Sequence, residues 1–590
     1  MHQNPSTVTS TAASDDEHQA RLAAQQLDSQ LHAAVAKLSG GLSPISLALA
    51  WADWALHLAS QPGQAALLAA HGQQAALKWC AETLGQSPVP HDDPRFAATA
   101  WQNGPWAPWA QAQHAAEAWW AEATALRGMS PHHQQMTGFF ARQWLDMLSP
   151  TNAGLLNPEV LQRTQARAGA NLVDGAANLV DGWRRQLDLP PLHAAERRYR
   201  PGADVAITPG QVVHRNHLVE LIQYQPVTAS VHAEPVFIVP SWIMKFYILD
   251  LSAENSLVKW LVSQGHTVFI LSWRNPDESD ALLGLDDYLE QGVFDALAAI
   301  KRLVPAQKVH ACGYCLGGTL LALGAAALAR PGRIERAAQL PELATVTLLA
   351  AETDFTEPGE MGVLIDESQV ALLEDMMAER GFLSGPQMAG SFTYLHAREL
   401  VWSQRLRAFW LGEPDQPNDL MAWNADTTRM PAVMHSEYLR RCYLRNEIAE
   451  GRFPVEGRPV SLDDLSLPLF VVGTEKDHVS PWKSVYKIHR LTDTLLTFVL
   501  TSGGHNAGIV SEPGHAHRNY ALRTRPSNGP WQDPAQWQAG AVQHEGSWWP
   551  AWSDWLLTHG SGERVHPRKP PLDAALGRAP GRYVHQCYRD

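Results

Sequence analysis

Cysteine is scarce in this sequence: 590 residues contain only five, at positions 80, 312, 315, 442 and 587. So few and so scattered cysteines do not build a disulfide framework, and they fit a reducing, cytoplasmic compartment. Cys312 and Cys315 form a C-x-x-C pair, but no second pair or Cys/His cluster accompanies it, which argues against zinc. The sequence also lacks a metal or nucleotide motif, so we expect no metal and no resident cofactor.

Positive charge is also sparse. The chain has 46 Lys and Arg against 60 Asp and Glu, a net charge of −14, and no tract rich in Lys or Arg. This pattern argues against nucleic acid as a partner. The sequence shows no uninterrupted apolar run long enough to span a bilayer and no basic-then-apolar leader, so we expect neither a membrane span nor a signal peptide.

Apolar material is abundant, with 45% hydrophobic residues and 23 tryptophans, and the chain is long enough for roughly two to four domains. Residues 1–18 are polar and without periodicity, so we predict a disordered tail. Residues 19–200 show Ala- and Leu-rich helical patterns, which predict a helical N-terminal domain. We interpret the tryptophans of this domain as core residues at helical spacing rather than as a docking surface for a partner, lipid or polymer. These are Trp101, Trp106, Trp109, Trp119 and Trp120.

Strands alternate with helices over 201–575, which predicts a mostly parallel sheet covered on both faces. The alternation of strands and helices is interrupted at about 352–463, where helical patterning indicates an insertion that caps the site. A short C-terminal tail, 576–590, follows. The predicted strands are 235–239, 266–272, 309–312, 345–350, 468–473 and 495–500. Together these features predict an α/β-hydrolase core with a helical cap insertion, preceded by a mostly helical N-terminal domain.

The central motif of the sequence is Gly313-Tyr-Cys315-Leu-Gly-Gly318, which joins a predicted strand to a predicted helix. A G-x-nucleophile-x-G turn of this kind is the nucleophile elbow of α/β hydrolases, here with Cys in place of Ser. The helix N-terminus beneath the sulfur favours a thiolate, and the backbone N–H of Leu316 is placed to bind an oxyanion. Two alternatives stay open: Cys315 as an ordinary buried cysteine, and Cys312 with Cys315 as a redox pair.

A nucleophile on this fold needs an acid and a histidine, in that chain order, after late strands. Asp477 follows one such strand and His505 follows the next, within a Gly-rich loop. His478 is the rival base, but neighbouring side chains on an extended segment point in opposite directions, so we assign it a supporting position. Glu475 is a weaker candidate for the acid. A thiolate paired with histidine suits acyl transfer, although hydrolysis and amide cleavage also remain open.

The sequence from about Leu31 onward resembles the class I polyhydroxyalkanoate synthases, the single-subunit poly(3-hydroxybutyrate) polymerases. The resemblance rests on the Cys-containing, lipase-like box at 313–318 and on further stretches. These are Asp93–Phe96, Lys245–Leu251, Gln264–Asp277, Asp477-His478, Gly504–Ile509 and Gly546–Pro550.

The resemblance implies an acyltransferase that polymerises (R)-3-hydroxyacyl-CoA, with a short-chain unit such as 3-hydroxybutyryl favoured, and releases CoA. Cys315 would carry the acyl chain as a thioester, and His505 would deprotonate Cys315. Asp477 would orient His505 or help to activate the attacking 3-hydroxyl. CoA enters only as the leaving group. The resemblance also implies a homodimer in the cytoplasm at the surface of polyester granules, together with granule-associated proteins.

Two other functions fit the same residues. A Cys-dependent thioesterase or esterase would use water to resolve the acyl-enzyme, since fold alone does not fix function. A non-catalytic granule scaffold is the other, although it has no need for the ordered set Cys315, Asp477 and His505. One departure from many relatives, Ser241-Trp-Ile-Met244 in the loop after an early strand, bears on chain-length preference.

Overall fold

The computed structural model describes most of the chain. The described residues are 11–84, 93–102, 105–186, 189, 192, 199–332, 335–385, 387, 390, 395, 398–413 and 418–587. They divide into two compact units. The sheet unit comprises Met1–Pro44, Ala206–Gln387 and Asp426–Asp590, and the helical unit comprises Ile45–Val205 and Met388–Ala425. The described residues include no helix that is both long and apolar enough to cross a bilayer.

The sheet unit is built on a ten-stranded sheet with the order β1-β2-β5-β4-β6-β7-β12-β13-β14-β15. Its six central strands, from β5 to β13, run parallel, and antiparallel strands extend both edges. The central strands are β4 (Val236–Val239), β5 (Val268–Trp273), β6 (Val309–Tyr314), β7 (Leu343–Leu349), β12 (Leu469–Thr474) and β13 (Leu496–Thr501). The edge strands are β1 (Gly210–Arg215), β2 (Val219–Tyr224), β14 (Asn519–Arg525) and β15 (Val542–Glu545).

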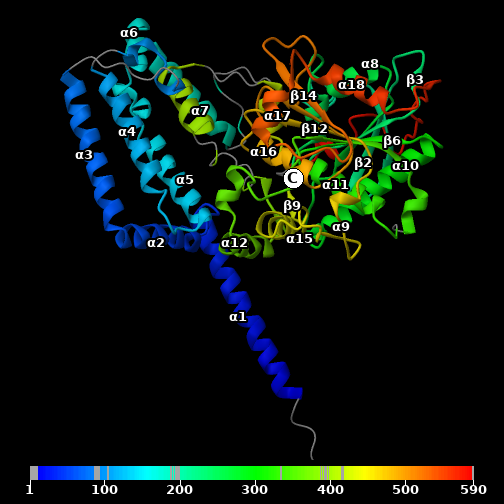
Figure 1. Ribbon diagram of the computed structural model, residues 1–590, viewed down its shortest axis with the longest axis horizontal. Coiled ribbons are helices and arrows are strands. Elements are labelled where there is room, and N and C mark those ends of the chain that lie inside the picture. Colours follow the sequence, from blue (N-terminus) through cyan, green and yellow to red (C-terminus); the bar gives the residue numbers. More distant parts are fainter. Residues whose placement is uncertain are drawn as a thin grey trace, which may run out of the picture. The chain divides into compact units, whose positions relative to one another are not determined.

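Composition explains why the central strands lie inside. Apart from β6 (VHACGY), they are short runs rich in Val, Leu, Ile, Phe and Thr, and nearly every residue in the six strands is buried, as expected where helices cover both faces of a parallel sheet. In Figure 1, α8 (Leu257–Ser263) and α18 (Trp549–Thr558) are drawn on one side of the strands. The helices α10 (Asp295–Leu303) and α11 (Leu316–Ala329) are drawn on the other side. Each predicted strand has its counterpart here, whereas β14 and β15 were not anticipated.

Further short elements of the sheet unit lie in the connections. They are α9 (Leu285–Asp287), α12 (Glu367–Ala378), α15 (Ala432–Glu437), α16 (Trp482–Tyr486) and α17 (Pro534–Gly540). Three small ribbons accompany them: β3 (Val231–His232) with β16 (Arg564–Val565), β8 (Phe382–Leu383) with β9 (Met430–Pro431), and β10 (Pro454–Val455) with β11 (Arg458–Pro459).

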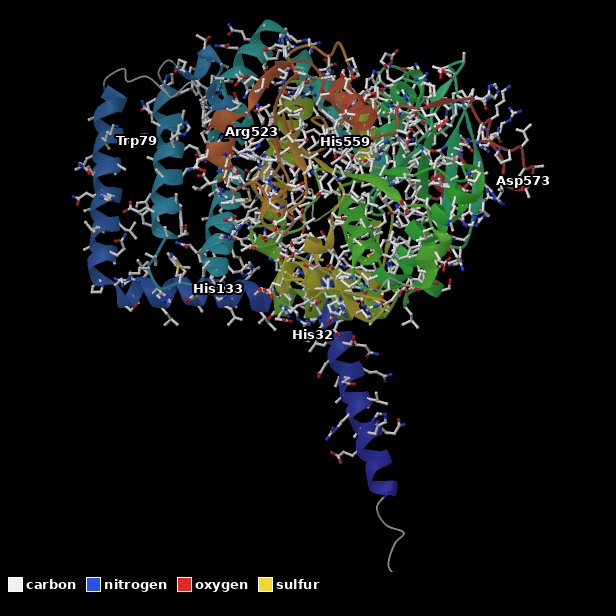
Figure 2. All side chains as sticks on the ribbon, turned by 45° about the vertical axis from the view of Figure 1, so that its right-hand side comes forward. His32, Trp79, His133, Arg523, His559 and Asp573 are labelled. Atoms are coloured by element: carbon white, nitrogen blue, oxygen red, sulfur yellow. The ribbon has the colours of Figure 1, made fainter. Side chains whose placement is uncertain are left out.

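The helical unit contains α2 (Pro44–Ser60), α3 (Pro62–Leu84), α4 (Ala107–Ala123), α5 (Pro131–Met147), α6 (Pro158–Ala166), α7 (Ala170–Gln186) and α14 (Asp419–Asn424). The indole of Trp79 on α3, labelled in Figure 2, donates to the Pro108 carbonyl on α4. Trp101 is fully buried, but Trp109 is 55% exposed. Core packing therefore describes Trp101 well and Trp109 poorly.

The predicted boundaries differ from this arrangement in two places. Residues 1–10 lie outside the described residues, but 11–18 are helical within α1 (Thr11–Leu38), so predicting disorder there was wrong. Ala and Glu are good helix formers, and the pair of Glu17 with Arg21 at 2.7 Å supports the same helix. The predicted cap at 352–463 is also divided, because 388–425 belongs to the helical unit.

The predicted C-terminal tail is packed rather than loose. Val212 N–H donates to the Gly577 carbonyl and Ala579 N–H donates to the Gly210 carbonyl, so this segment covers the edge strand β1. The carboxylate of Glu220 on β2 is buried, and its Oε2 accepts from the backbone N–H groups of Arg582 at 2.8 Å and Tyr583 at 3.0 Å.

We predict that Glu220→Gln lowers the free energy of unfolding by about 3 kcal/mol, because it leaves the guanidinium of Arg215 without its buried counter-charge. Arg215 Nη2 lies 2.5 Å from Glu220 Oε1. Urea denaturation measures the change. Glu545→Gln, on the exposed strand β15, is the matched control and is expected to change stability by less than about 0.5 kcal/mol. Equal effects of the two substitutions would contradict the structural role of Glu220.

Candidate active site

Cys315 occupies a sharp turn between the end of β6 and the start of α11. Its φ is 51°, a left-handed conformation that few residues with a side chain adopt. The backbone holds it there, because Cys315 N–H donates to the Leu349 carbonyl on the neighbouring strand β7 at 2.9 Å. Such strain is typical of residues whose side chain must project from the end of a strand.

The glycines around Cys315 are required by close packing. A Cβ added to Gly317 would lie 2.2 Å from the Val239 carbonyl oxygen, and one added to Gly313 would lie 2.4 Å from Gly318 Cα. Strand β6, helix α11 and the loop after β4 therefore approach one another to a distance that only glycine permits. This is the geometry expected of the Gly-x-Cys-x-Gly turn that the sequence predicts.

The structure brings Asp477 and His505 together. Asp477 lies just beyond β12 and His505 just beyond β13, and these adjacent parallel strands end at the same edge of the sheet. His505 Nδ1 is 2.8 Å from Asp477 Oδ2, and the imidazole also hydrogen-bonds the thiol of Cys315. The three predicted side chains thus form one chain of contacts, in the order nucleophile, histidine, acid.

Asp477 is held firmly. Its Oδ2 accepts from Thr474 Oγ1 at 2.9 Å, and its Oδ1 accepts from the backbone N–H groups of Val479 and Ser480. Burial alone would raise the pKa of Asp477, but the charge and hydrogen bond of His505, helped by these donors, lower it. The carboxylate is therefore ionised and oriented at neutral pH.

His505 is the complementary partner. Burial by itself would lower its pKa, yet the charges of Asp477 and Cys315 and the hydrogen bonds to both outweigh burial, so the pKa of His505 lies well above its usual value. An imidazole in this state readily takes and holds a proton beside the sulfur. The contact pattern is the one that activates a weak nucleophile by an adjacent base.

Two more predicted residues flank this set. Leu316 is the first residue of α11. The N–H groups in the first turn of a helix have no carbonyl partner within the helix, so the N–H of Leu316 can donate to an oxyanion. His478 has an exposed side chain beside the buried Asp477, as the opposite orientation of neighbouring residues predicts. Its backbone carbonyl accepts from Glu360 N–H at 3.2 Å. The side chain of Glu475 is also exposed.

The cysteine alternatives differ in burial. Cys312 and Cys315 are both free thiols, with Cys312 fully buried and Cys315 half-buried. Burial raises the pKa of the Cys312 thiol, which keeps it protonated and inert. The contact with His505 distinguishes Cys315 from an ordinary core cysteine.

Some residues around the site were not anticipated from the sequence. Tyr314 donates its hydroxyl hydrogen to Asn506 Oδ1 at 2.5 Å, and its ring lies 5.8 Å from that of His505. Thr474 supports Asp477, as described above. Each of these residues lies next to a predicted site residue in the sequence or within a few positions of one. Their closeness to Cys315, Asp477 and His505 at the ends of strands was the signal that could have identified them.

Among the described residues, one group of three potential metal ligands lies close together: Asp93, His114 and Glu117 in the helical unit. Arg95 already occupies it, with Nη2 2.6 Å from Asp93 and 2.8 Å from Glu117. An arginine at the centre makes this an ion-pair network, since its charge repels a cation.

Comparison with known proteins identifies three matching family models. Two are described as the N-terminal part of poly-beta-hydroxybutyrate polymerase and match residues 92–261 and 22–64. The third is described as the alpha/beta hydrolase fold and matches residues 234–512. The last match, with the sheet order and the turn at Cys315, confirms the predicted α/β-hydrolase core.

Curated relatives match over most of the chain. A poly(3-hydroxyalkanoate) polymerase from Methylorubrum extorquens is 38% identical, with 84% of this chain and 81% of the relative covered. Those of Rhizobium etli and Cupriavidus necator are 36% and 35% identical, covering 85% of this chain and 78% and 85% of the relatives. Among solved structures, a Paleococcus ferrophilus monoacylglycerol lipase is 12% identical, with 58% of this chain and all of that one covered, and a TM-score of 0.31.

We predict that iodoacetamide alkylates Cys315 at least about tenfold more slowly in His505→Gln, because the thiol loses the group that takes its proton. Asp477→Asn also slows the reaction, since losing the carboxylate charge lowers the pKa of His505. Peptide mass spectrometry over time separates Cys315 from the exposed Cys80 and Cys587. His478→Gln is the control and keeps the wild-type rate. A wild-type rate in His505→Gln would refute the pairing.

We predict that Gly317→Ala disrupts the turn, lowering the free energy of unfolding by at least about 2 kcal/mol and slowing alkylation of Cys315. The added methyl group would collide with backbone rather than with a side chain that could move. Gly182→Ala in α7 is the control, because nothing lies within 4 Å of its added Cβ. Helix propensity makes that control neutral or slightly stabilising. Wild-type stability in Gly317→Ala would show that the close approach is not needed.

Proposed function

The chain belongs to the poly(3-hydroxyalkanoate) polymerase family, and on this premise we propose that it joins (R)-3-hydroxyacyl units from CoA thioesters into a polyester. The observation that carries the proposal is the contact of Cys315 with His505 and of His505 with Asp477 at the end of the sheet. The family membership supplies the product class, and the site supplies the chemistry that an acyl transfer needs.

In the first step, His505 takes the proton of Cys315, and the thiolate attacks the thioester carbonyl of the substrate. The backbone N–H of Leu316, at the start of α11, stabilises the oxyanion that develops. The carbon–sulfur bond to CoA then breaks, and His505 returns its proton to the departing CoA thiolate. A thioester is exchanged for a thioester, so this step is close to balanced in free energy.

In the second step, a 3-hydroxyl group attacks a thioester carbonyl, a new ester bond forms, and the thiolate of Cys315 or CoA leaves. His505 accepts the proton of the hydroxyl. All the contacts of Asp477 support an orienting role: one oxygen faces His505 and Thr474, and the other is bound to two backbone N–H groups. Because both oxygens of this carboxylate already accept hydrogen bonds, Asp477 is poorly placed to activate a hydroxyl group itself.

Aromatic side chains near the elbow support a short acyl side chain. Trp242, in the loop after β4, lies 5.7 Å from the ring of Tyr288 and 6.4 Å from that of Tyr438. The π-helical turn Tyr438–Leu444 also carries Tyr443, which interacts electrostatically with Cys315. Large rings packed against one another in this way would leave room for a methyl group more readily than for a long alkyl chain. We therefore propose (R)-3-hydroxybutyryl-CoA as the preferred substrate.

The remaining parts of the proposal follow from the chemistry. CoA acts only as the leaving group, and the side chains named above are sufficient without a resident cofactor. The polyester is insoluble and stays attached to Cys315 as it grows, so the protein is held at the surface of its own cytoplasmic granule. A homodimer and contacts with granule-associated proteins belong to the same proposal through the family resemblance.

Purified protein incubated with (R)-3-hydroxybutyryl-CoA tests the proposal, with free CoA followed by a thiol reagent and polyester collected as insoluble material. We expect both products, and a loss on the order of 10⁴-fold or more in Cys315→Ala. Cys312→Ala, at the inert neighbouring thiol, is the matched control and keeps the activity.

Other outcomes point elsewhere. CoA release with only free 3-hydroxybutyrate would replace the synthase by a thioesterase. No CoA release from short- or longer-chain 3-hydroxyacyl-CoA, with binding to polyester retained, would favour a scaffold.

A further inference from the structure

Glu352 is a buried carboxyl that the steps above do not use. It lies just beyond β7, the strand whose end holds Cys315 in place, and it is 4% exposed. Its backbone is fixed to the elbow helix, because Thr319 Oγ1 donates to the Glu352 carbonyl at 2.7 Å. Ala350, two residues earlier, has a φ of 46° and donates its N–H to the Val472 carbonyl on β12. The position of Glu352 is thus set by the same strands that build the site.

The buried carboxyl of Glu352 has an oxygen, Oε1, without a hydrogen-bond partner among the described residues. Burying a polar group without a partner is costly, so such groups in folded proteins are nearly always satisfied. An unsatisfied oxygen beside a nucleophile therefore calls for an explanation, and a bound molecule would supply the missing partner.

The surroundings of Glu352 are those of the nucleophile. Burial first, and then the charges of Asp477 and Cys315, raise the pKa of Glu352 well above its usual value, against the opposing effects of His505 and Lys487. The raised pKa favours the neutral carboxyl, which can donate a hydrogen bond as well as accept one. A group that keeps its proton so strongly is unsuited to act as a base.

Aromatic groups complete the wall. Tyr438 and Tyr443 both interact electrostatically with Glu352, and their hydroxyl oxygens are 3.3 Å apart. The ring of Phe355 lies 6.0 Å from that of Tyr438 and 5.1 Å from that of Tyr443. Glu352 is thus a single hydrogen-bonding acid beside an aromatic surface, as in sites that bind an apolar molecule through one polar atom.

We propose that Glu352 recognises the substrate by hydrogen-bonding the 3-hydroxyl oxygen of the acyl group, and the ester oxygen that replaces it in the growing chain. This inference rests on the proposed function. The 3-hydroxyl is only a short way along the acyl chain from the carbonyl carbon that Cys315 attacks, so its partner must lie beside the nucleophile. A site with a buried group that needs this partner selects against an acyl group that lacks the hydroxyl.

The test compares (R)-3-hydroxybutyryl-CoA with butyryl-CoA, which differs only in lacking the hydroxyl. CoA released in the first turnover is measured by stopped flow for the wild type, Glu352→Leu and Glu352→Gln. We expect the wild type to prefer the hydroxylated substrate by about tenfold or more. Glu352→Leu loses that preference, chiefly by reacting more slowly with the hydroxylated substrate. Glu352→Gln keeps most of it, because an amide still donates a hydrogen bond.

Glu357→Leu is the matched control. Glu357 lies in the same segment after β7, but its side chain is 73% exposed and pairs with Lys487 at 2.9 Å. It is expected to keep the wild-type preference. Alkylation of Cys315 by iodoacetamide is measured in every variant, because intact alkylation shows that the turn and the nucleophile are undisturbed. Glu352→Met, closest in shape, repeats the comparison if Glu352→Leu does not fold.

Two results would overturn the assignment of Glu352. An unchanged preference in Glu352→Leu or Glu352→Met would show that the carboxyl does not bind the hydroxyl. An equal loss on both substrates together with slower alkylation would make Glu352 a structural support of the turn. A wild type that releases no CoA from either substrate overturns the proposed function itself, which separates the two failures.

Discussion

The close approach of backbone at the turn around Cys315 is the constraint on which the rest of the site depends. Gly317 lies against the carbonyls of the loop after β4, and Gly313 against Gly318. This contact fixes where α11 begins and hence where the N–H of Leu316 lies. The strained φ of Cys315 is maintained by its hydrogen bond to Leu349, so strands β6 and β7 hold Cys315 jointly. Side-chain chemistry is then added to a backbone frame that tolerates few alternatives.

The sequence predicts this frame well because its signals are local. Buried parallel strands are short runs of Val, Leu and Phe, and a Gly-x-Cys-x-Gly turn has few other uses. Asp477 and His505 could be found because the acid and histidine follow strands in a set order. The features that the sequence did not predict depend on contacts between residues far apart in the chain. Residues 576–587 pack along β1, the backbone N–H of Arg582 donates to Glu220, and β14 and β15 extend the sheet edge.

Glu352 illustrates why part of the site escapes sequence analysis. Its pattern places it at the start of a cap insertion, and nothing in its neighbours marks it as buried. Only the packing of β7 against the elbow helix and β12 fixes its backbone at this end of the sheet, where its carboxyl interacts with the charges of Asp477 and Cys315. A polar residue within three positions of the end of a central strand was the one available signal, since parallel strands present their following residues at a single edge of the sheet.

Asp477 and Glu352 show how one buried site keeps two carboxyl groups in different states. Asp477 has a cationic partner and donors on both oxygens, so the pKa of this carboxyl is lowered despite burial. Glu352 has no ion-pair partner among the described residues, and burial, followed by the charge of Asp477, raises the pKa of its carboxyl. Ionising the second carboxyl would place two negative charges close together, which is unfavourable in a buried site. In the proposed function, the ionised acid orients His505, and the neutral acid donates a hydrogen bond to the substrate.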